Sequence, residues 1–189
     1  MPDESYASIP ELPPLARQAT FAGGCFWCMQ PPFDACPGVI HTLVGYCGGS
    51  VERPSYQAVC SGSTGHLESI LVQYSPQEVS YTELLDIFWR SIDPTQADGQ
   101  FADRGSHYHS AIFVGNEEER AIAEASRDSL QASGIFRDPI TTRIVDAAPF
   151  YPAETYHQNY YRNNSLHYNA YKEGSGRGPF LRRVWEEQA

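Results

Sequence analysis

The chain has 189 residues, a formal net charge of −10 at pH 7 and 41% hydrophobic residues. This length suffices for a hydrophobic core that needs no metal or disulfide, and the composition is that of a folded protein. The acidic charge argues against nucleic acid and anionic membranes as partners, and no apolar run approaches the roughly 20 residues that span a bilayer.

Residues 1–16 are acidic and rich in proline, without the basic start or apolar centre of a secretory signal. We therefore expect a flexible tail, a cytoplasmic location and a single domain over residues 17–189, with residues 172–189 as a C-terminal tail. All five cysteines lie between Cys25 and Cys60. An odd number of cysteines in a reducing compartment favours redox or nucleophilic chemistry over structural disulfides.

The hydrophobic pattern predicts strands and helices that mostly alternate. In chain order we expect a strand at 17–24, a helix at 25–36, strands at 38–49 and 66–76, a helix at 80–93, a strand at 108–115, a helix at 116–134 and a strand at 140–147. Residues 150–164 should be helical in part, and residues 173–188 should combine a flexible turn with a short amphipathic run. Strands and helices around one sheet predict a two-layer α/β domain.

The first strand, helix and strand predict a right-handed crossover with two parallel strands, whose ends place Cys25 and Cys47 on the same side of the molecule. The helix between them contains Pro31 and Pro32, which remove backbone donors, so it should be kinked or begin late. Cys25 follows two glycines and opens this helix, where backbone N–H groups favour a thiolate. A glycine-flanked corner between strand and helix is typical of a nucleophile.

Cys25 and Cys28 form a C-x-x-C motif that allows more than one interpretation. A zinc ribbon needs a second C-x-x-C, and no cysteine follows Cys47 at the required spacing. A thioredoxin-like dithiol fits a motif beside a strand–helix–strand unit, although the bulky Phe26 and Trp27 separate its cysteines. The motif alone does not decide which substrate the thiols act on.

Five segments carry a resemblance to a known family: GGCFWC, GYCGG, PSYQAVCSGSTGHLESILVQY, DIFWRSIDPTQADGQFADRGSHYHSAIF and PFYPAETYHQNYY. From about Arg17 to Arg162 the chain resembles the A-type peptide-methionine sulfoxide reductases. The resemblance implies reduction of methionine S-sulfoxide, free and in peptides and proteins, with thioredoxin as reductant and no cofactor or metal. The fold we expect is a two-layer α/β sandwich with a mixed sheet, a ferredoxin-like core and a long irregular C-terminal segment, as a monomer.

The resemblance also implies site residues, and their chemistry suits the reaction. Transferred position by position, it gives Cys25 as the nucleophile, Glu68 as the acid, Tyr56 and Tyr108 as donors to the sulfoxide oxygen, Phe26 and Trp27 as the pocket for the substrate methyl group, and Asp103 as a supporting residue. The oxygen must take up protons as its bond to sulfur breaks, so an acid and phenols fit. Glu68 stands in an apolar strand, and partial burial should raise its pKa.

The chain departs from this resemblance in the cysteine that resolves a Cys25 sulfenic acid into a disulfide. Many relatives carry that cysteine in a glycine-rich C-terminal tail, and residues 173–189 contain none. Cys28 stands where glycine is common in relatives and is our first candidate, with Cys47 as the alternative. Direct attack by an external thiol comes third, and Cys36 or Cys60 come last.

Other residues give weaker signals. His66 and the alternating His107 and His109 complete no coherent ligand set, so we predict no metal site. Cys60 is expected to be a buried, inert thiol. Two competing functions stay open: a general C-x-x-C thiol–disulfide oxidoreductase, which would not need Glu68, and a zinc-binding interaction module.

Overall fold

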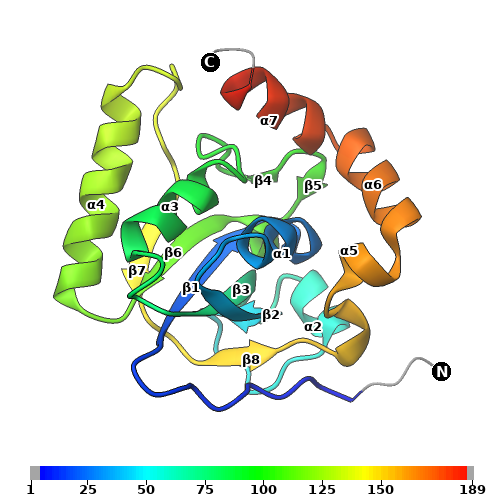
Figure 1. Ribbon diagram of the computed structural model, residues 1–189. Coiled ribbons are helices and arrows are strands. Elements are labelled where there is room, and N and C mark those ends of the chain that lie inside the picture. The colour runs from blue at the N-terminus through cyan, green and yellow to red at the C-terminus, as the bar shows by residue number, and fades with distance from the viewer. Residues whose placement is uncertain (1–4, 187–189) are drawn as a thin grey trace.

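A curled six-stranded sheet forms the centre of the computed structural model, which describes residues 5–186 (Figure 1). Its order is β7-β6-β1-β3-β2-β8, with β1 (Arg17–Gly23), β2 (Val39–Cys47), β3 (Leu67–Tyr74), β6 (Ser110–Val114), β7 (Arg143–Asp146) and β8 (Phe150–Pro152). A small second sheet pairs β4 (Gly99–Gln100) with β5 (Asp103–Arg104). Only β6 and β7 pair in parallel among the described strands, so the mixed α/β fold is confirmed.

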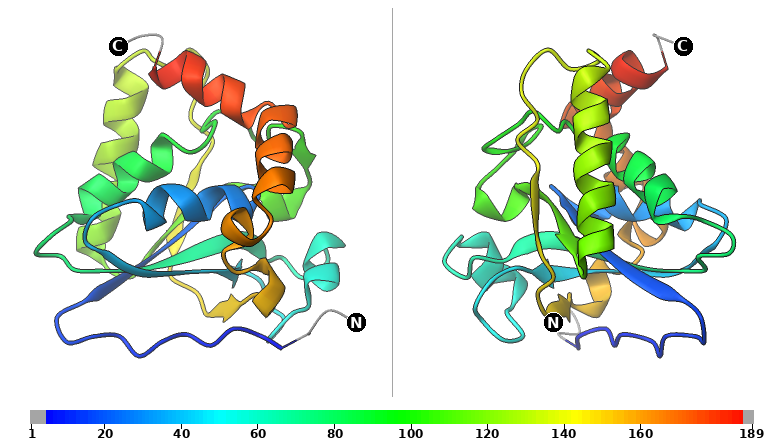
Figure 2. Two further views of the ribbon diagram at one scale, coloured as in Figure 1. Left: turned by 45° about the vertical axis from the view of Figure 1, so that its right-hand side comes forward. Right: turned by 90° about the vertical axis from the view of Figure 1, so that its left-hand side faces the viewer.

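The helices are α1 (Phe26–Asp34), α2 (Tyr56–Cys60), α3 (Tyr81–Trp89), α4 (Glu117–Ala132), α5 (Tyr160–Asn163), α6 (Ser165–Gly174) and α7 (Arg177–Trp185), with 3-10 turns η1 (Ser106–Tyr108) and η2 (Thr155–His157). Figure 2 shows α1, α3 and α4 on the same side of the sheet. The predicted capping box begins α3: the Ser80 hydroxyl accepts from the Glu83 N–H at 3.2 Å, and the Glu83 carboxylate accepts from the Ser80 N–H at 2.7 Å.

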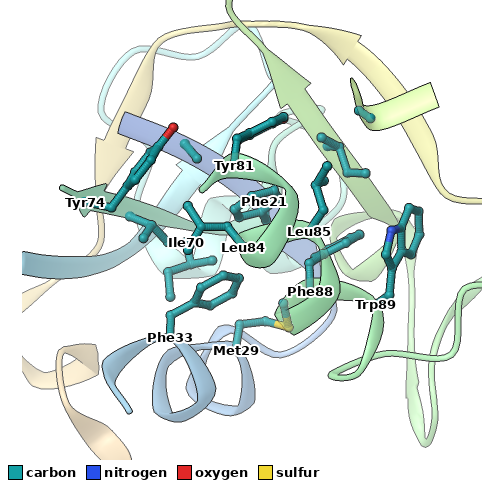
Figure 3. Packing of buried hydrophobic residues seen from close by; sticks show 14 of the residues in the cluster. Phe21, Met29, Phe33, Ile70, Tyr74, Tyr81, Leu84, Leu85, Phe88 and Trp89 are labelled. Carbon is teal, nitrogen blue, oxygen red and sulfur yellow. The ribbon is translucent and has the colours of Figure 1, made fainter. Parts of the chain in front are cut away.

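The main core lies between α1, α3 and the sheet (Figure 3). Phe21 of β1 is fully buried, and its ring stacks 5.3 Å from the rings of both Phe33 on α1 and Phe88 on α3. Stacked aromatic pairs stabilise beyond their burial by about 0.5–1.5 kcal/mol each. This packing fixes α1 against β1 and therefore fixes the corner between them, where Cys25 lies.

The predicted parallel direction of β1 and β2 is confirmed, because both strands are antiparallel to β3 between them. Helix α1 begins at Phe26, directly after the corner, and continues through Pro31 and Pro32. A late start is therefore wrong. The helix tolerates two lost donors because Phe26, Met29 and Phe33 are buried, and tertiary packing outweighs local propensity.

Residues 5–16 are bound to the body of the molecule, which differs from the loose tail expected. The Ala7 N–H donates to the Ala153 carbonyl at 3.2 Å, and the Thr155 N–H donates to the Ser5 carbonyl at 2.8 Å. Figure 2 shows this segment along the side of the sheet that faces away from α1. No helix within residues 5–186 is long and apolar enough to cross a membrane.

Candidate active site

Cys25 occupies the corner between β1 and α1 that the sequence predicts. It is the N-cap residue of α1 and is 6% exposed. Gly24 before it has φ +80°, a left-handed conformation that favours glycine, and a Cβ there would lie 2.5 Å from the side chain of Gln100. The turn therefore depends on glycine, and it directs the Cys25 thiol toward the start of the helix.

Glu68 lies beside this corner, on the central strand β3. Its carboxylate accepts a hydrogen bond of 3.1 Å from the Phe26 N–H, the first residue after Cys25. Glu68 is 1% exposed, and burial raises its pKa to about 8 against the lowering effect of that hydrogen bond. The side chain is thus a protonated acid at neutral pH, as general acid catalysis requires.

Tyr56 and Tyr108 reach the same place from α2 and η1. Burial raises the pKa of each phenol, and the charge of Glu68 is the next contribution for both. The charge of Cys25 also acts on Tyr108. The Tyr56 N–H is held by the buried Glu154 carboxylate at 2.8 Å. The structure therefore brings Cys25, Glu68 and both phenols, the residues predicted to be catalytic, to one site, with the phenols protonated.

Phe26 and Trp27 form the aromatic side of this site. Phe26 is 1% exposed, and its ring lies 6.5 Å from that of Tyr56. Trp27 is half-buried, stacks on Tyr160 with ring centroids 3.9 Å apart, and donates through Nε1 to Nδ1 of His157 at 3.1 Å. Burial lowers the pKa of His157 to about 4, so this histidine is a neutral acceptor. The role of Phe26 and Trp27 as a pocket for the substrate methyl group stays a prediction, and the sequence did not single out their partners His157 and Tyr160.

The Cys25 and Cys28 thiols are hydrogen-bonded to each other, and both are buried. This bond lowers the pKa of Cys28 to about 7, and the charges of Arg177 and Lys172 act in the same direction. Burial raises the pKa of Cys25, and its bond to Cys28 adds to the effect. The two thiols thus share one negative charge near neutral pH and titrate as a pair.

Two tyrosines of α6 complete the surroundings of the thiols. The Tyr171 hydroxyl donates to the Asp103 carboxylate and also contacts the Cys25 thiol, which favours the thiolate. Tyr168 contacts the Cys28 thiol. Asp103 therefore supports the site through Tyr171. Sequence reasoning missed both tyrosines, although their spacing of three residues on a helix places them on one face.

Arg177, at the start of α7, was also missed. It is 1% exposed, and its guanidinium donates to the Gly23 carbonyl at 2.9 Å and the Ser91 carbonyl at 2.7 Å. It packs 4.7 Å from the centroid of the Phe101 ring. Within the described residues, the segment expected as a C-terminal tail instead completes α6 and forms α7, which Arg177 fixes to the end of β1.

The remaining cysteines are placed differently from one another. Cys47 pairs with Leu67 across the sheet and packs on the face opposite to Glu68, where burial raises its pKa to about 12. The C-terminal ends of β1 and β2 lie at the same edge of the sheet, as predicted. Because successive side chains of a strand point to opposite faces of the sheet, Cys47 is nevertheless separated from Cys25. Cys60 is half-buried rather than buried, and it contacts the Tyr56 hydroxyl.

Comparison with known proteins places the chain among relatives. Residues 17–189 match the sequence profile of the peptide methionine sulfoxide reductase family. The Bacillus subtilis (strain 168) peptide methionine sulfoxide reductase MsrA is 53% identical over 167 residues, which are 88% of this chain and 94% of that protein. The structure of methionine sulfoxide reductase A of Corynebacterium diphtheriae has a TM-score of 0.71 and 34% identity, covering 81% of this chain and 77% of that chain.

Structures of Mxr1 from Saccharomyces cerevisiae share the fold. Its reduced form has a TM-score of 0.77 and 29% identity, covering 82% of this chain and 90% of that chain. The same protein in complex with Trx2 has a TM-score of 0.57 and 21% identity. Together with the match over residues 17–189, the identity to MsrA shows that the chain belongs to the A-type peptide methionine sulfoxide reductases.

Proposed function

We propose that this protein reduces the S epimer of methionine sulfoxide, free and in peptides and proteins, through a sulfenic acid on Cys25. Cys25 attacks the sulfoxide sulfur from the form of the thiol pair that carries the shared negative charge on Cys25, while Glu68 gives a proton to the oxygen and Tyr56 and Tyr108 hold it. The oxygen passes to Cys25 as a sulfenic acid, and methionine leaves. Phe26 and Trp27 hold the substrate methyl group through contacts between sulfur and aromatic rings.

The observation that carries this proposal is the contact between the acid and the nucleophile's helix. The Phe26 N–H that binds Glu68 at 3.1 Å comes directly after Cys25, so the acid cannot move independently of the thiol. A general thiol–disulfide exchange enzyme needs only the two cysteines. A buried carboxyl that stays protonated up to about pH 8, next to two phenols, has a use when an oxygen must be protonated.

Cys28 is the proposed resolving cysteine. Its sulfur already contacts Cys25, and its lowered pKa supplies a thiolate near neutral pH. Attack of Cys28 on the sulfenic sulfur forms a disulfide and releases water. A dithiol reductant then restores both thiols. We propose thioredoxin in this role, in line with the complex between the related Mxr1 and Trx2. Free thiols suit a reducing compartment such as the cytoplasm, and the site is complete in one chain, as a monomer requires.

Single-turnover reactions without reductant test the first step. Cys25→Ser should release no methionine, because a hydroxyl is a poor nucleophile toward sulfur at neutral pH. Glu68→Gln should slow methionine release by about 10²–10⁴-fold, the usual contribution of a general acid. An unchanged rate in Glu68→Gln would show that the tyrosines or water supply the proton. A wild-type protein that reduced a small disulfide substrate but released no methionine would favour the competing thiol–disulfide oxidoreductase.

The second step is tested in the same reaction. Cys28→Ser should release a single equivalent of methionine, because oxygen transfer precedes disulfide formation, and should then stall as a sulfenic acid that dimedone traps. Mass spectrometry of the wild-type protein after one turnover should locate the disulfide between Cys25 and Cys28. A disulfide mapped to any other pair would remove Cys28 from this role.

A further inference from the structure

Three side chains from separate segments, one of them the proposed catalytic acid, place metal-binding atoms together. Cys60 ends α2, Glu68 lies on β3 and His107 is in η1. The thiol sulfur of Cys60, a carboxylate oxygen of Glu68 and an imidazole nitrogen of His107 lie within 4.8 Å of one another. Among the residues that the structure describes, this is the one group of three such side chains at this spacing.

These ligand types select a particular class of metal. Thiolate, imidazole and carboxylate bind Zn²⁺ at about 2.0–2.3 Å, and three protein ligands leave a fourth position open. Softer ligands such as thiolate disfavour Mg²⁺ and Ca²⁺, which take oxygen ligands. A small contraction of the group would bring all three atoms into a tetrahedral shell.

The burial of the group supports this assignment. His107 is 6% exposed, and its Nδ1 atom has no hydrogen-bond partner within residues 5–186. Glu68 is 1% exposed, whereas Cys60 is half-buried and gives an ion a route from solvent. The charge of the Glu154 carboxylate acts on Cys60 and favours a cation beside it. A buried nitrogen without a partner is rare in native proteins, and a bound cation supplies one.

We propose that Cys60, Glu68 and His107 bind Zn²⁺ reversibly, and that the bound ion inhibits the enzyme. The bound ion takes the Glu68 carboxylate as a ligand, so this side chain is no longer available to the sulfoxide oxygen. The ion also lies beside Tyr56, which contacts Cys60, and beside Tyr108, whose ring centroid lies 4.0 Å from that of His107. It therefore occupies the place of the oxygen. The metal site stands on its own geometry, whereas the inhibition rests on the function proposed above.

Cobalt binding tests the site without any activity assay, because a thiolate bound to Co²⁺ absorbs in the near ultraviolet. Cys25 and Cys28 form a second pair of thiols that could hold metal, so the experiment uses the Cys25→Ser/Cys28→Ser protein. It should still bind Co²⁺ with the thiolate band. Adding Cys60→Ser should abolish the band, and adding His107→Gln should weaken binding at least about tenfold, as loss of metal-site partners does.

The same chain offers matched control variants, and two results would contradict the proposed site. Cys36→Ser and His109→Gln, in that background, should leave the band and the affinity unchanged, and circular dichroism checks that each variant is folded. The site is overturned if the Cys25→Ser/Cys28→Ser protein shows no thiolate band, or if the band survives Cys60→Ser. Either result would place the metal elsewhere.

Inhibition is measured by single-turnover methionine formation, which needs no added thiol to chelate the metal. Zn²⁺ should block wild-type turnover, a chelator should restore it, and Mg²⁺ should have no effect. His107→Gln should need at least about ten times more Zn²⁺, relative to its own metal-free rate. Zinc binding without inhibition would overturn the inhibitory role alone. A wild-type protein without reductase activity would overturn the proposed function, while the cobalt result still decides the site.

Discussion

At the level of single residues, Glu68 combines a chemical advantage with a cost in stability. Burial raises its pKa from 4.5 to about 8, which keeps a proton available for the sulfoxide oxygen. The unfolded chain loses this proton above about pH 4.5, whereas the folded chain retains it. The folded state therefore binds more protons between these two values, and the free energy of unfolding falls as pH rises from about 4.5 to 8.

Glu68→Gln should accordingly stabilise the protein at pH 7.5 by on the order of 3 kcal/mol, because glutamine is neutral in both states. At pH 4.5 the two proteins should be nearly equal in stability. Urea unfolding at both pH values measures the difference. An equal gap at pH 4.5 and 7.5 would mean that the gain comes from packing rather than from the proton.

Tyr56 and Tyr108 should be coupled, since both phenols donate to one oxygen. Tyr56→Phe and Tyr108→Phe should each lower kcat/KM by about tenfold, the effect of one hydrogen bond to a charged group. The double variant should lose more than the product of the two. A double-mutant cycle on kcat/KM measures this coupling. Strictly additive free-energy losses would show that the two phenols act on different groups.

At the level of elements, α7 depends on one buried cation. Arg177 binds two backbone carbonyls, of Gly23 and Ser91, from segments far away in the sequence. Arg177→Met leaves both carbonyls unsatisfied and should lower the free energy of unfolding by about 3–5 kcal/mol, since hydrogen bonds to charged groups contribute about 1.5–3 kcal/mol each. Urea unfolding measures this loss, and the exposed Arg183→Met is the matched control, expected to change little.

The same substitution should also affect Cys28. The charge of Arg177 contributes to the low pKa of this thiol, so its alkylation by iodoacetamide should shift to higher pH in Arg177→Met. Measuring the reaction in the Cys25→Ser background isolates Cys28 from its partner, with Arg183→Met as control. A stability loss without a shift in the alkylation profile would restrict Arg177 to a structural role.

Elements that depend on interactions within a few residues could be predicted from the sequence, and elements that depend on contacts between distant segments could not. The glycines before Cys25 and the Ser80–Glu83 capping box act within a few residues, so sequence alone locates the corner and the start of α3. Strand β8 and the bound course of residues 5–16 depend on hydrogen bonds between distant segments, which no local pattern encodes. Tyr171 and Arg177 were missed for the same reason, because their partners lie far away in the chain.

At the level of the whole molecule, the sheet separates the candidate resolving thiols. Cys28 is in contact with Cys25, whereas Cys47 packs on the opposite face with Leu67 and Phe113. Cys47→Ser should therefore sustain multiple turnovers with thioredoxin at nearly the wild-type rate, and Cys28→Ser should lose most of its activity. Steady-state turnover of the two variants, measured side by side, decides this. If Cys28→Ser cycled normally and Cys47→Ser stalled, Cys47 would be the resolving cysteine. The corner between β1 and α1 would then have to rearrange, because Cys47 lies on the opposite face of the sheet.

The fluorescence of Trp27, which stacks on Tyr160, reports the redox state of the dithiol. Of the three tryptophans, Trp27 lies between Cys25 and Cys28 in the sequence and 6.2 Å from the Tyr171 ring, while Trp89 is buried in the main core and Trp185 packs under Arg90. Disulfides quench nearby indole emission. In a Trp89→Phe/Trp185→Phe background, fluorescence from Trp27 therefore follows oxidation and reduction of the dithiol in real time, without a label or a coupled enzyme.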